Sequence, residues 1–223
     1  MPARAVFIAG AGTEIGKTYV TAALTRRLRD AGRTVRAVKP LASGVPPLDD
    51  PGFAGSDTAR LLDAQAIGLD IEAVEACSPW RFTAPLSPDQ AAVLEGRSLA
   101  LADLVGWSRA QIAGTQGTLL IEGVGGLMSP VTEAATGLDW LRALDVPALL
   151  VSGSYLGAIS HTLTACETLR AHHVPLRAVV VSESRGAPAP ASTVAAAIAR
   201  HAGAPVFCLR RGDACPAGLA ELI

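Results

Sequence analysis

Short apolar runs recur along the chain, and segments with helical periodicity separate most of them. The runs are continuous rather than alternating, which is typical of parallel strands buried on both faces. We expect strands at 6–9, 35–38, 118–121, 148–151, 178–181 and 206–209. In the first helical segment, Val20, Ala23, Leu24 and Leu28 share one face, and Gly32 ends the helix.

The remaining periodic segments predict helices at 58–64, 101–112, 157–171 and 192–202. This alternation favours an α/β fold with a doubly wound, mostly parallel sheet and helices on both faces. A length of 223 residues suits a single domain over 1–223. The turn-rich spans 46–55 and 77–88 predict loops near a ligand, and 186–190 predicts a surface connection.

The segment Ala11-Gly-Thr-Glu-Ile-Gly-Lys-Thr18 lies between the first apolar run and the first helix. Strand, glycine-rich turn and helix are the setting of a P-loop, whose backbone N–H groups surround nucleotide phosphates. Lys17 would reach the β- and γ-phosphates, and Thr18 would hold Mg²⁺. Ala11 stands in the place of the first glycine, and Gly10 lies one residue too early. A plain turn with a solvated lysine is the alternative, but the three parts agree and favour a P-loop NTPase-like domain.

Composition and charge exclude several other classes of protein. No apolar run approaches the ~20 residues that span a bilayer, and we expect no membrane segment. The net charge of −1 and the lack of a basic block argue against nucleic-acid binding. The first strand leaves no room for a signal peptide, so we expect a cytoplasmic protein. The four scattered cysteines then predict reduced thiols.

Glu122 ends the apolar run 118–121 and is followed by Gly123-Val-Gly-Gly126. A carboxylate at the end of a buried strand commonly binds Mg²⁺ in nucleotide enzymes, directly or through water. The glycines allow the backbone to approach phosphate or substrate. The alternative is a carboxylate that points into solvent.

Three further residues are ambiguous from spacing alone. Asp57 would cap the helix 58–64, or would bind Mg²⁺ beside Thr18 and Glu122. Lys39 ends the second strand, where it would stabilise a transferred phosphoryl group or lie on the surface. Ser43 has the same two interpretations, a residue of the site or a residue of the surface. The histidines His161, His172 and His173 pair with no evident nucleophile.

Together these segments resemble the dethiobiotin synthetase family, whose members close the ureido ring in biotin synthesis with ATP. The similar parts run in the family's order over nearly the whole chain, at 12–18, 39–44, 56–57, 85–88, 122–126 and 156–157 with His161. The resemblance implies a ligase that acts on 7,8-diaminopelargonate, CO₂ or bicarbonate, and ATP. It also implies a homodimer with the substrate's tail near the subunit interface.

The resemblance assigns roles to residues. Mg²⁺ would be bound by Thr18, Asp57 and Glu122. Lys39 would be catalytic and would contact the substrate carbamate and the γ-phosphate. Substrate contacts would come from Thr13 and Ser43. The nucleotide would be held by Glu14, Ile15, Gly16, Lys17 and Thr18, with the backbone of Gly123, Val124 and Gly125 lining the site.

The chain departs from the family pattern in three places. Ser182-Glu183 stand where the family often has Asn-Asp, so the contact with the nucleobase and the preference for ATP stay open. Asp89 stands where a histidine is frequent, and Ser160 replaces an asparagine near the expected substrate carboxylate. None of these residues belongs to the expected phosphate and Mg²⁺ groups, so we expect the reaction to survive.

Two other classes of protein compete with this interpretation. Regulatory ATPases of the chromosome-partitioning type share the fold, but their additional signature lysine would fall at position 12, which is Gly12 here. Amidoligases related to the cobyrinate-type synthetases usually carry an additional glutaminase domain, for which the chain leaves no room.

Overall fold

The computed structural model describes residues 4–223 and contains a central sheet of six parallel strands. Their order across the sheet is β10-β9-β8-β1-β5-β2. Each expected apolar run forms a strand of this sheet. The strands are β1 (Arg4–Gly10), β2 (Val35–Val38), β5 (Thr118–Glu122), β8 (Ala148–Ser152), β9 (Leu176–Ser182) and β10 (Val206–Leu209). Residues 1–3 of the expected 1–223 domain lie outside the described residues.

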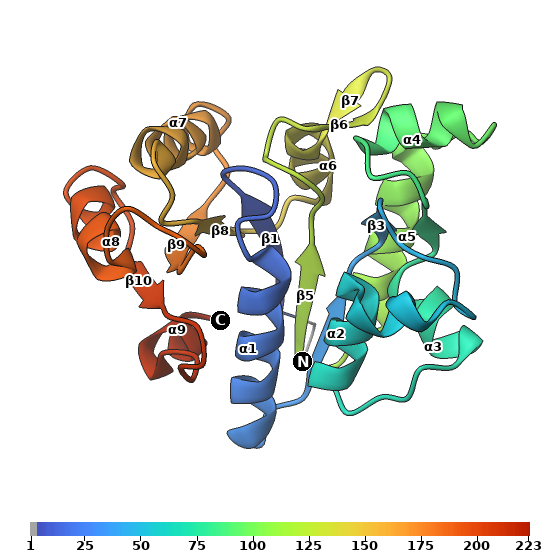
Figure 1. Ribbon diagram of the computed structural model, residues 1–223, viewed down its shortest axis with the longest axis horizontal. Helices are drawn as coiled ribbons and strands as arrows, with labels where there is room; N and C mark the ends of the chain where they lie inside the picture. The colour runs from blue at the N-terminus through green and yellow to red at the C-terminus, as the bar shows by residue number, and fades with distance from the viewer. Residues whose placement is uncertain (1–3) are drawn as a thin grey trace.

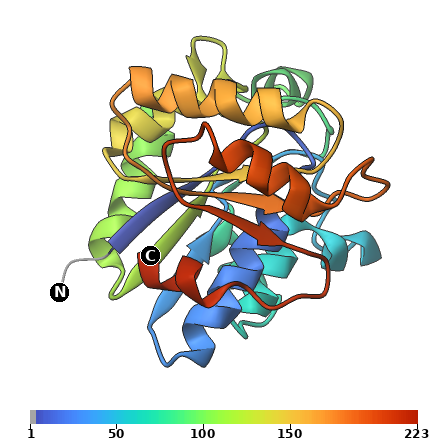
Figure 2. The same ribbon diagram turned by 90° about the vertical axis from the view of Figure 1, so that its left-hand side faces the viewer.

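Helices cover both faces of the sheet (Figure 1). One face packs against α1 (Lys17–Asp30), α2 (Asp57–Ala64), α3 (Ile71–Cys77) and α9 (Ala217–Leu222). The other packs against α4 (Pro88–Leu94), α5 (Leu101–Gly114), α6 (Gly137–Leu144), α7 (Ala158–Ala171) and α8 (Ala191–Ala199). Figure 2 shows α7 on one side of the sheet and α1 and α9 on the other. The fold class predicted from the sequence is therefore confirmed.

The two layers bury the apolar faces that the periodicity indicated. Leu24 and Leu28 of α1 are fully buried against one face. On the other, Trp140 of α6 meets Phe7 of β1 edge to face, with ring centroids 4.9 Å apart. Such aromatic pairs add stability beyond the area that they bury.

Short elements lie within the two turn-rich spans predicted as loops, and others lie in segments for which no element was predicted. The 3-10 helix η1 (Pro51–Gly55) ends the first turn-rich span. Two strands of two residues each, β3 (Leu41–Ala42) and β4 (Trp80–Arg81), pair in parallel. The strands β6 (Pro130–Thr132) and β7 (Ala135–Thr136) form an antiparallel hairpin beyond the main sheet. Among residues 4–223, none of the helices has the length and apolar character needed to cross a membrane.

Several helix boundaries differ from expectation, and α5 ends at Gly114 rather than 112, α7 begins at Ala158 rather than 157, and α8 begins at Ala191 rather than 192. The helix predicted to begin at residue 58 begins at Asp57, and its N-cap is Ser56, whose hydroxyl accepts a hydrogen bond from the Ala59 N–H at 3.1 Å. The interpretation of Asp57 as the cap was therefore wrong. The helix α8 ends at Ala199 rather than at 202, because the chain turns before Gly203, which has a φ of 66°.

The parallel arrangement brings the carboxyl ends of β1, β2 and β5 to one edge of the sheet. Ile8 of β1 pairs with Glu122 of β5, and Val38 of β2 pairs with Ile121. Ligands of open α/β sheets bind outside the carboxyl ends of the strands. The segments after β1, β2 and β5 are therefore neighbours in space, although they are far apart in sequence.

Candidate active site

The P-loop depends on two glycines for space. A Cβ atom on Gly10 would lie 2.8 Å from the carbonyl oxygen of Gly125 and 2.9 Å from that of Gly12, which is too close for any side chain. Gly16 has a φ of 93°, and a Cβ atom there would lie 2.4 Å from Oγ of Ser182. Position 10, rather than position 11, is therefore a place in this loop where a Cβ atom does not fit. Ala11 can then stand where the pattern has its first glycine.

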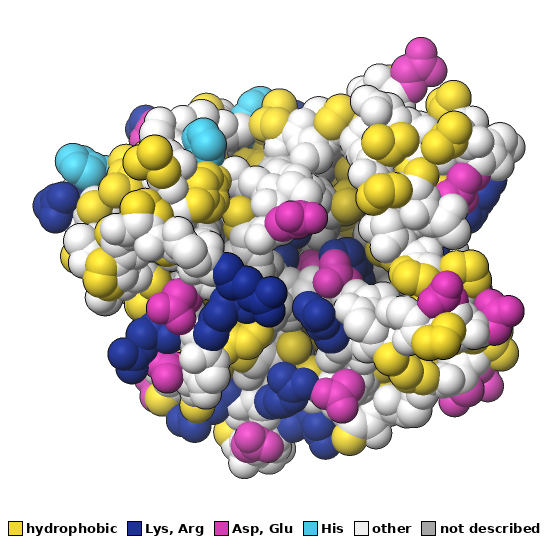
Figure 3. Space-filling view, in the orientation of Figure 1, with side chains coloured by type: hydrophobic (Ala, Val, Ile, Leu, Met, Phe, Trp, Pro, Cys, Tyr) yellow, Lys and Arg dark blue, Asp and Glu magenta, His cyan; other side chains and the backbone are white. Residues whose placement is uncertain are grey.

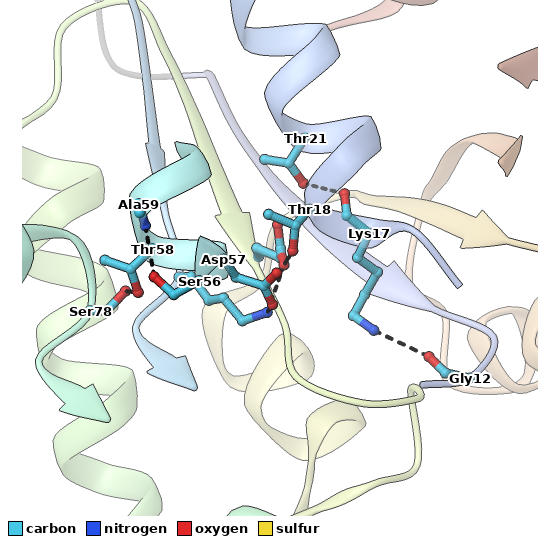
Figure 4. A network of polar contacts seen from close by, with 11 residues as sticks. Gly12, Lys17, Thr18, Thr21, Ser56, Asp57, Thr58, Ala59 and Ser78 are labelled. Carbon is cyan, nitrogen blue, oxygen red and sulfur yellow. Dashed lines mark hydrogen bonds and ion pairs between the residues drawn. The ribbon is translucent and has the colours of Figure 1, made fainter. Parts of the chain in front are cut away.

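Lys17 is the first helical residue after this loop, and its ammonium turns back over the loop. Its Nζ donates a hydrogen bond to the carbonyl oxygen of Gly12 at 3.1 Å (Figure 4). Burial, followed by repulsion from Lys39, lowers the pKa of Lys17 to about 8. A buried ammonium with one carbonyl partner is well placed to receive the negative charge of a phosphate.

Four side chains from different elements meet beside the loop. The hydroxyl of Thr18 donates to Oε1 of Glu122 at 2.6 Å. Nζ of Lys39 donates to the same oxygen at 2.9 Å and also to Oδ2 of Asp57. Figure 4 shows Thr18 and Asp57 facing one another from α1 and α2. We call these four side chains the lysine–carboxylate group.

The burial of this group excludes the surface alternatives. Lys39 is 5% exposed and Glu122 is 0% exposed. Lys39 is thus not a solvated surface lysine, and Glu122 does not point into solvent. The side chain of Asp57 is 40% exposed, which leaves one side of the group open to a ligand.

The charges in the group stabilise one another. Burial opposes the charged form of Lys39, but attraction to Glu122 and Asp57 and the hydrogen bonds to them raise the pKa of its ammonium above the usual value. Burial likewise raises the pKa of Asp57, but attraction to Lys39 and its hydrogen bond outweigh burial and lower it. Both residues are therefore charged at neutral pH.

One oxygen of Glu122 has no partner in the described residues. Its Oε2 is buried and accepts no hydrogen bond, although a buried carboxylate oxygen normally has one. Mg²⁺ prefers oxygen ligands and is usually held by one or two carboxylates together with phosphate oxygens and water. The hydroxyl of Thr18, the carboxylate of Asp57 and this free oxygen fit such an ion. Among the described residues there is no cluster of three or more acidic, His or Cys side chains, so phosphate and water would have to supply the other ligands.

The glycine segment after β5 packs against the P-loop. Gly123 donates its N–H to the carbonyl oxygen of Ile8 at 3.0 Å, and a Cβ atom on it would meet Phe7 at 2.8 Å. Thr13 is exposed, and its hydroxyl lies 3.6 Å from where a Cβ atom of Gly125 would be. The structure therefore brings Thr13, Val124 and the neighbouring glycines together.

Three other predicted residues, Glu14, Ile15 and Ser43, are not part of the lysine–carboxylate group. Glu14 is exposed with a φ of 56°, and the side chain of Ile15 is buried in the core, so only their backbone groups can serve a phosphate. Ser43 is half-buried beside the 85–88 segment, because Gly44 donates its N–H to the carbonyl oxygen of Ala84 at 3.0 Å. Among the described residues, no hydrogen bond joins the Ser43 hydroxyl to the lysine–carboxylate group.

Comparison with known proteins identifies the chain. The model of a family described as an AAA domain matches residues 4–209. A protein of Methylobacterium nodulans named ATP-dependent dethiobiotin synthetase is 68% identical over 95% of both chains. Proteins with the same name from a Caulobacter species and from Acidiphilium cryptum are 50% and 44% identical, over 96% and 90% of this chain and 91% of each relative. The chain belongs to the dethiobiotin synthetase family.

Solved structures with low sequence identity show the fold alone. A ParA family ATPase of Chlorobium tepidum matches 98% of this chain and 87% of its own, with a TM-score of 0.51 and 11% identity. The MinC:MinD complex of Aquifex aeolicus gives a TM-score of 0.52 at 14% identity, over 99% of this chain and 85% of the other. The similarity confirms the P-loop NTPase-like fold. Membership of the dethiobiotin synthetase family makes the chain an enzyme, an ATP-using ligase of biotin biosynthesis.

One pair of side chains in this member of the dethiobiotin synthetase family was missed from the sequence. The hydroxyl of Tyr155 lies 2.9 Å from Nδ1 of His161, and 3.5 Å from where a Cβ atom of Gly12 would be. The pair thus lies over the P-loop, at the start of α7. His161 was part of the family resemblance together with Leu156-Gly157, but a tyrosine six residues before a histidine gives no recognisable pattern, so Tyr155 was not predicted.

Two cavities flank α7. One of about 490 Å³ lies between α7 and the backbone of the P-loop, and it is lined in part by Gly10, Ser129 and His161. The other, of about 820 Å³, lies between α7 and α8 and is lined in part by Leu156 and Val194. Both have largely apolar walls, which suits a ligand with an aliphatic portion.

Proposed function

We propose that the chain converts 7,8-diaminopelargonate, CO₂ and ATP into dethiobiotin, ADP and phosphate, with Mg²⁺ as cofactor. The observation that carries this proposal is the lysine–carboxylate group, which lies buried beside a P-loop at the carboxyl ends of three strands. The family name supports the product, and the arrangement of charges supports the chemistry.

The proposed reaction brings two anions together. An amine of the substrate captures CO₂ as a carbamate, and a carbamate oxygen attacks the γ-phosphate of ATP. The resulting mixed carbamic–phosphoric anhydride is attacked by the neighbouring amine, which closes the five-membered ring and expels phosphate. The carbamate and the triphosphate repel one another, so the protein must supply positioning and positive charge.

The proposal gives each group of residues a separate role in this reaction. The backbone of 14–18 and the ammonium of Lys17 bind the phosphates. Thr18, Asp57 and Glu122 would hold Mg²⁺, which supplies positive charge where the phosphoryl group is transferred. Lys39 would contact the carbamate and the γ-phosphate. Thr13 and Ser43 would contact the substrate, and the backbone of Gly123, Val124 and Gly125 would line the site.

The proposal extends to the assembly. We expect a homodimer of single domains, each spanning 1–223, located in the cytoplasm. Several strongly exposed apolar side chains support an interface, because such side chains on a protein surface often mark a contact with a partner. They include Leu156 at 87% exposure, Val93 at 79% and Leu94 at 69%.

The decisive assay measures the product. The purified chain is incubated with 7,8-diaminopelargonate, bicarbonate and Mg²⁺·ATP, and dethiobiotin is detected by mass spectrometry. Substituting Lys39→Ala should reduce turnover at least ~10²-fold while circular dichroism shows a persisting fold. If folded wild-type protein yields no dethiobiotin, the proposal is wrong. Near-normal turnover of the variant would remove Lys39 from the catalytic role.

The same assay addresses the nucleobase. Ser182 lies directly beside the P-loop, close to Gly16, and Glu183 accepts a hydrogen bond from the N–H of Arg211 at 2.9 Å. A serine hydroxyl is a smaller recognition element than the two-sided amide of asparagine. Running ATP, CTP and GTP in parallel therefore tests whether the chain selects adenine.

A further inference from the structure

The contacts of Lys39 conflict with the role proposed for it. A lysine ammonium has three N–H donors. In the described structure, one donates to Oε1 of Glu122 and another to Oδ2 of Asp57, which leaves one donor free. The proposed reaction needs contacts to both a carbamate oxygen and a γ-phosphate oxygen. At least one carboxylate must therefore release Lys39 before catalysis.

The released carboxylate needs a new partner. Glu122 is fully buried, and its Oε2 already lacks a hydrogen-bond partner in the described residues. A buried carboxylate that loses the cation hydrogen-bonded to it is strongly disfavoured. A divalent cation that bound the free oxygen of Glu122 together with Thr18 would supply the missing charge.

We propose that Lys39 is the resident cation of the metal site in the nucleotide-free enzyme, and that the metal arriving with ATP displaces it. The inference rests on the proposed function, since it takes Thr18, Asp57 and Glu122 as the metal ligands. In the free enzyme the ammonium neutralises the two carboxylates and blocks them to metal alone. Metal and nucleotide together free the ammonium, which then turns to the phosphate and the carbamate.

Formal charges explain why nucleotide is needed. The positive charges of Lys17 and Lys39 balance the negative charges of Asp57 and Glu122. A free metal ion therefore finds no net negative charge at the site and meets a buried ammonium of the same sign. The triphosphate adds negative charge and gives Lys17 and Lys39 new partners, so metal binding becomes favourable.

The first test measures binding of Mn²⁺ alone to the full chain by isothermal titration calorimetry and electron paramagnetic resonance. We expect weak binding to the wild type and at least 10-fold tighter binding to Lys39→Met. Lys17→Met is the matched control, because it removes the same charge as Lys39→Met. The Lys17 ammonium donates its hydrogen bond to a backbone carbonyl oxygen and not to either carboxylate. Lys17→Met leaves Lys39 on both carboxylates, so its metal affinity should rise clearly less than that of Lys39→Met, although it removes the same formal charge. Equal gains in both variants, or no gain in Lys39→Met, would overturn the inference.

Two further measurements guard against a folding defect. Lys39→Gln keeps an N–H donor for one carboxylate and should show a smaller gain than Lys39→Met, with thermal melting used to verify the fold of each variant. A crystal structure of the wild type with Mg²⁺ and a non-hydrolysable ATP analogue needs no variant. We expect at least one of the two Lys39–carboxylate hydrogen bonds to be absent there. Both hydrogen bonds persisting beside a bound metal would contradict the inference.

Failure of the proposed function has a different signature. If Glu122→Gln leaves Mn²⁺ affinity unchanged in the presence of the ATP analogue, the metal ligands are wrongly assigned. If Glu122→Gln loses the metal while Lys39→Met gains nothing, the ligands stand and only the displacement of Lys39 is wrong.

Discussion

Gly10 shows that the P-loop is constrained by contacts outside its own sequence pattern. The carbonyl oxygens of Gly125 and Gly12 and Cδ of Lys17 surround the position of its missing Cβ at 2.8, 2.9 and 2.9 Å. Two of these neighbours are backbone atoms and cannot turn aside. The next residue, Ala11, carries a side chain. Glycine is therefore required at position 10 here, one residue before the position at which the P-loop pattern has it.

This constraint predicts the effect of single methyl groups. Gly10→Ala should shift the loop and weaken binding of a non-hydrolysable ATP analogue at least ~10-fold, a loss of about 1.4 kcal/mol. Gly12→Ala is the control, because a Cβ atom there would lie 3.5 Å from the hydroxyl of Tyr155, an ordinary contact. Its affinity should fall less than ~3-fold. Isothermal titration calorimetry of both variants measures the difference, and equal affinities would show that the crowding at Gly10 is relieved elsewhere.

At the scale of elements, α6 begins with a capping box. Thr136 accepts a hydrogen bond from the Asp139 N–H at 3.4 Å, and Oδ2 of Asp139 accepts the N–H and the hydroxyl of Thr136, each at 2.8 Å. These bonds satisfy donors that a helix N-terminus otherwise leaves free. The helix carries Trp140 into the core, so its cap supports the packing under β1.

The capping box should make stability depend on pH. The backbone and side-chain hydrogen bonds from Thr136 lower the pKa of Asp139. Because the pKa is lower in the folded state, the stabilisation is present above the unfolded value of about 4 and is lost as the pH falls through the folded value. Asp139→Asn should cost about 1 kcal/mol of unfolding free energy at pH 7 and less at pH 3.5.

A matched control exists in α5. Asp103 occupies the same third helical position, but the N-cap of α5 is Ala100, which offers no side-chain hydrogen bond. Asp103→Asn should therefore change the free energy of unfolding by less than ~0.5 kcal/mol at both pH values. Urea unfolding curves of the three proteins provide the measurement, and a cost for Asp139→Asn that does not vary with pH would rule out the titration of Asp139 as its cause.

The sequence predicted the six strands of the main sheet and five of the helices among the described residues, but it missed α3, α4, α6 and α9. Runs rich in apolar residues located β2 and β10 to the residue, although both are edge strands of the sheet and are only partly buried. The strand pairs β3–β4 and β6–β7 were missed, since a strand of two or three residues has too few positions for a period. The start of α2 was misplaced by one residue, because Ser56 and Asp57 are both good caps and only the fold decides between them.

Some features of the site could likewise be predicted from local sequence, and others depend on the fold. Glu122 and Lys39 were recognisable because they end buried strands, and parallel strands end at one edge. Their contact with one another could not be derived, because it depends on the order of β2 and β5 in the sheet. The Tyr155–His161 pair was missed because only the turn into α7 brings the two side chains together.

At the scale of the whole molecule, strand order assembles the site from distant segments. The strand β1 lies between β5 and β8, so the P-loop that follows it meets the 122–126 segment on one side and the 152–157 segment on the other. The strand β2 lies on the far side of β5 and brings Lys39 to the same edge. This strand order therefore brings the P-loop, Glu122 and Lys39 to one edge of the sheet. Figure 3 shows basic and acidic side chains side by side around the hollow in the middle of this face.

The exposed apolar side chains lead to a prediction about assembly. Leu156 lies at this edge of the sheet, directly after β8, and is 87% exposed. Apolar side chains also gather around α4 on the face seen in Figure 3. Val93 of this helix is 79% exposed. Leaving such side chains in water is unfavourable, at about 25 cal/mol per Å² of apolar surface. A second copy of the chain that covered them would contact the mouth of the site, which agrees with the dimer proposed from the family resemblance.

Light scattering tests this assembly. The wild type should have about twice the chain mass of 22.8 kDa. Leu156→Glu should weaken the dimer at least ~10-fold, because it would place a charge in an apolar contact. Ile71→Glu is the control, since Ile71 is 58% exposed but begins α3, on the other side of the sheet from α7 (Figure 1). A wild-type monomer at assay concentration would exclude the dimer, and an undiminished dimer in Leu156→Glu would place the interface elsewhere. Dissociation by Leu156→Glu alone would tie the subunit contact to the start of α7, beside the P-loop that each chain uses for its own nucleotide.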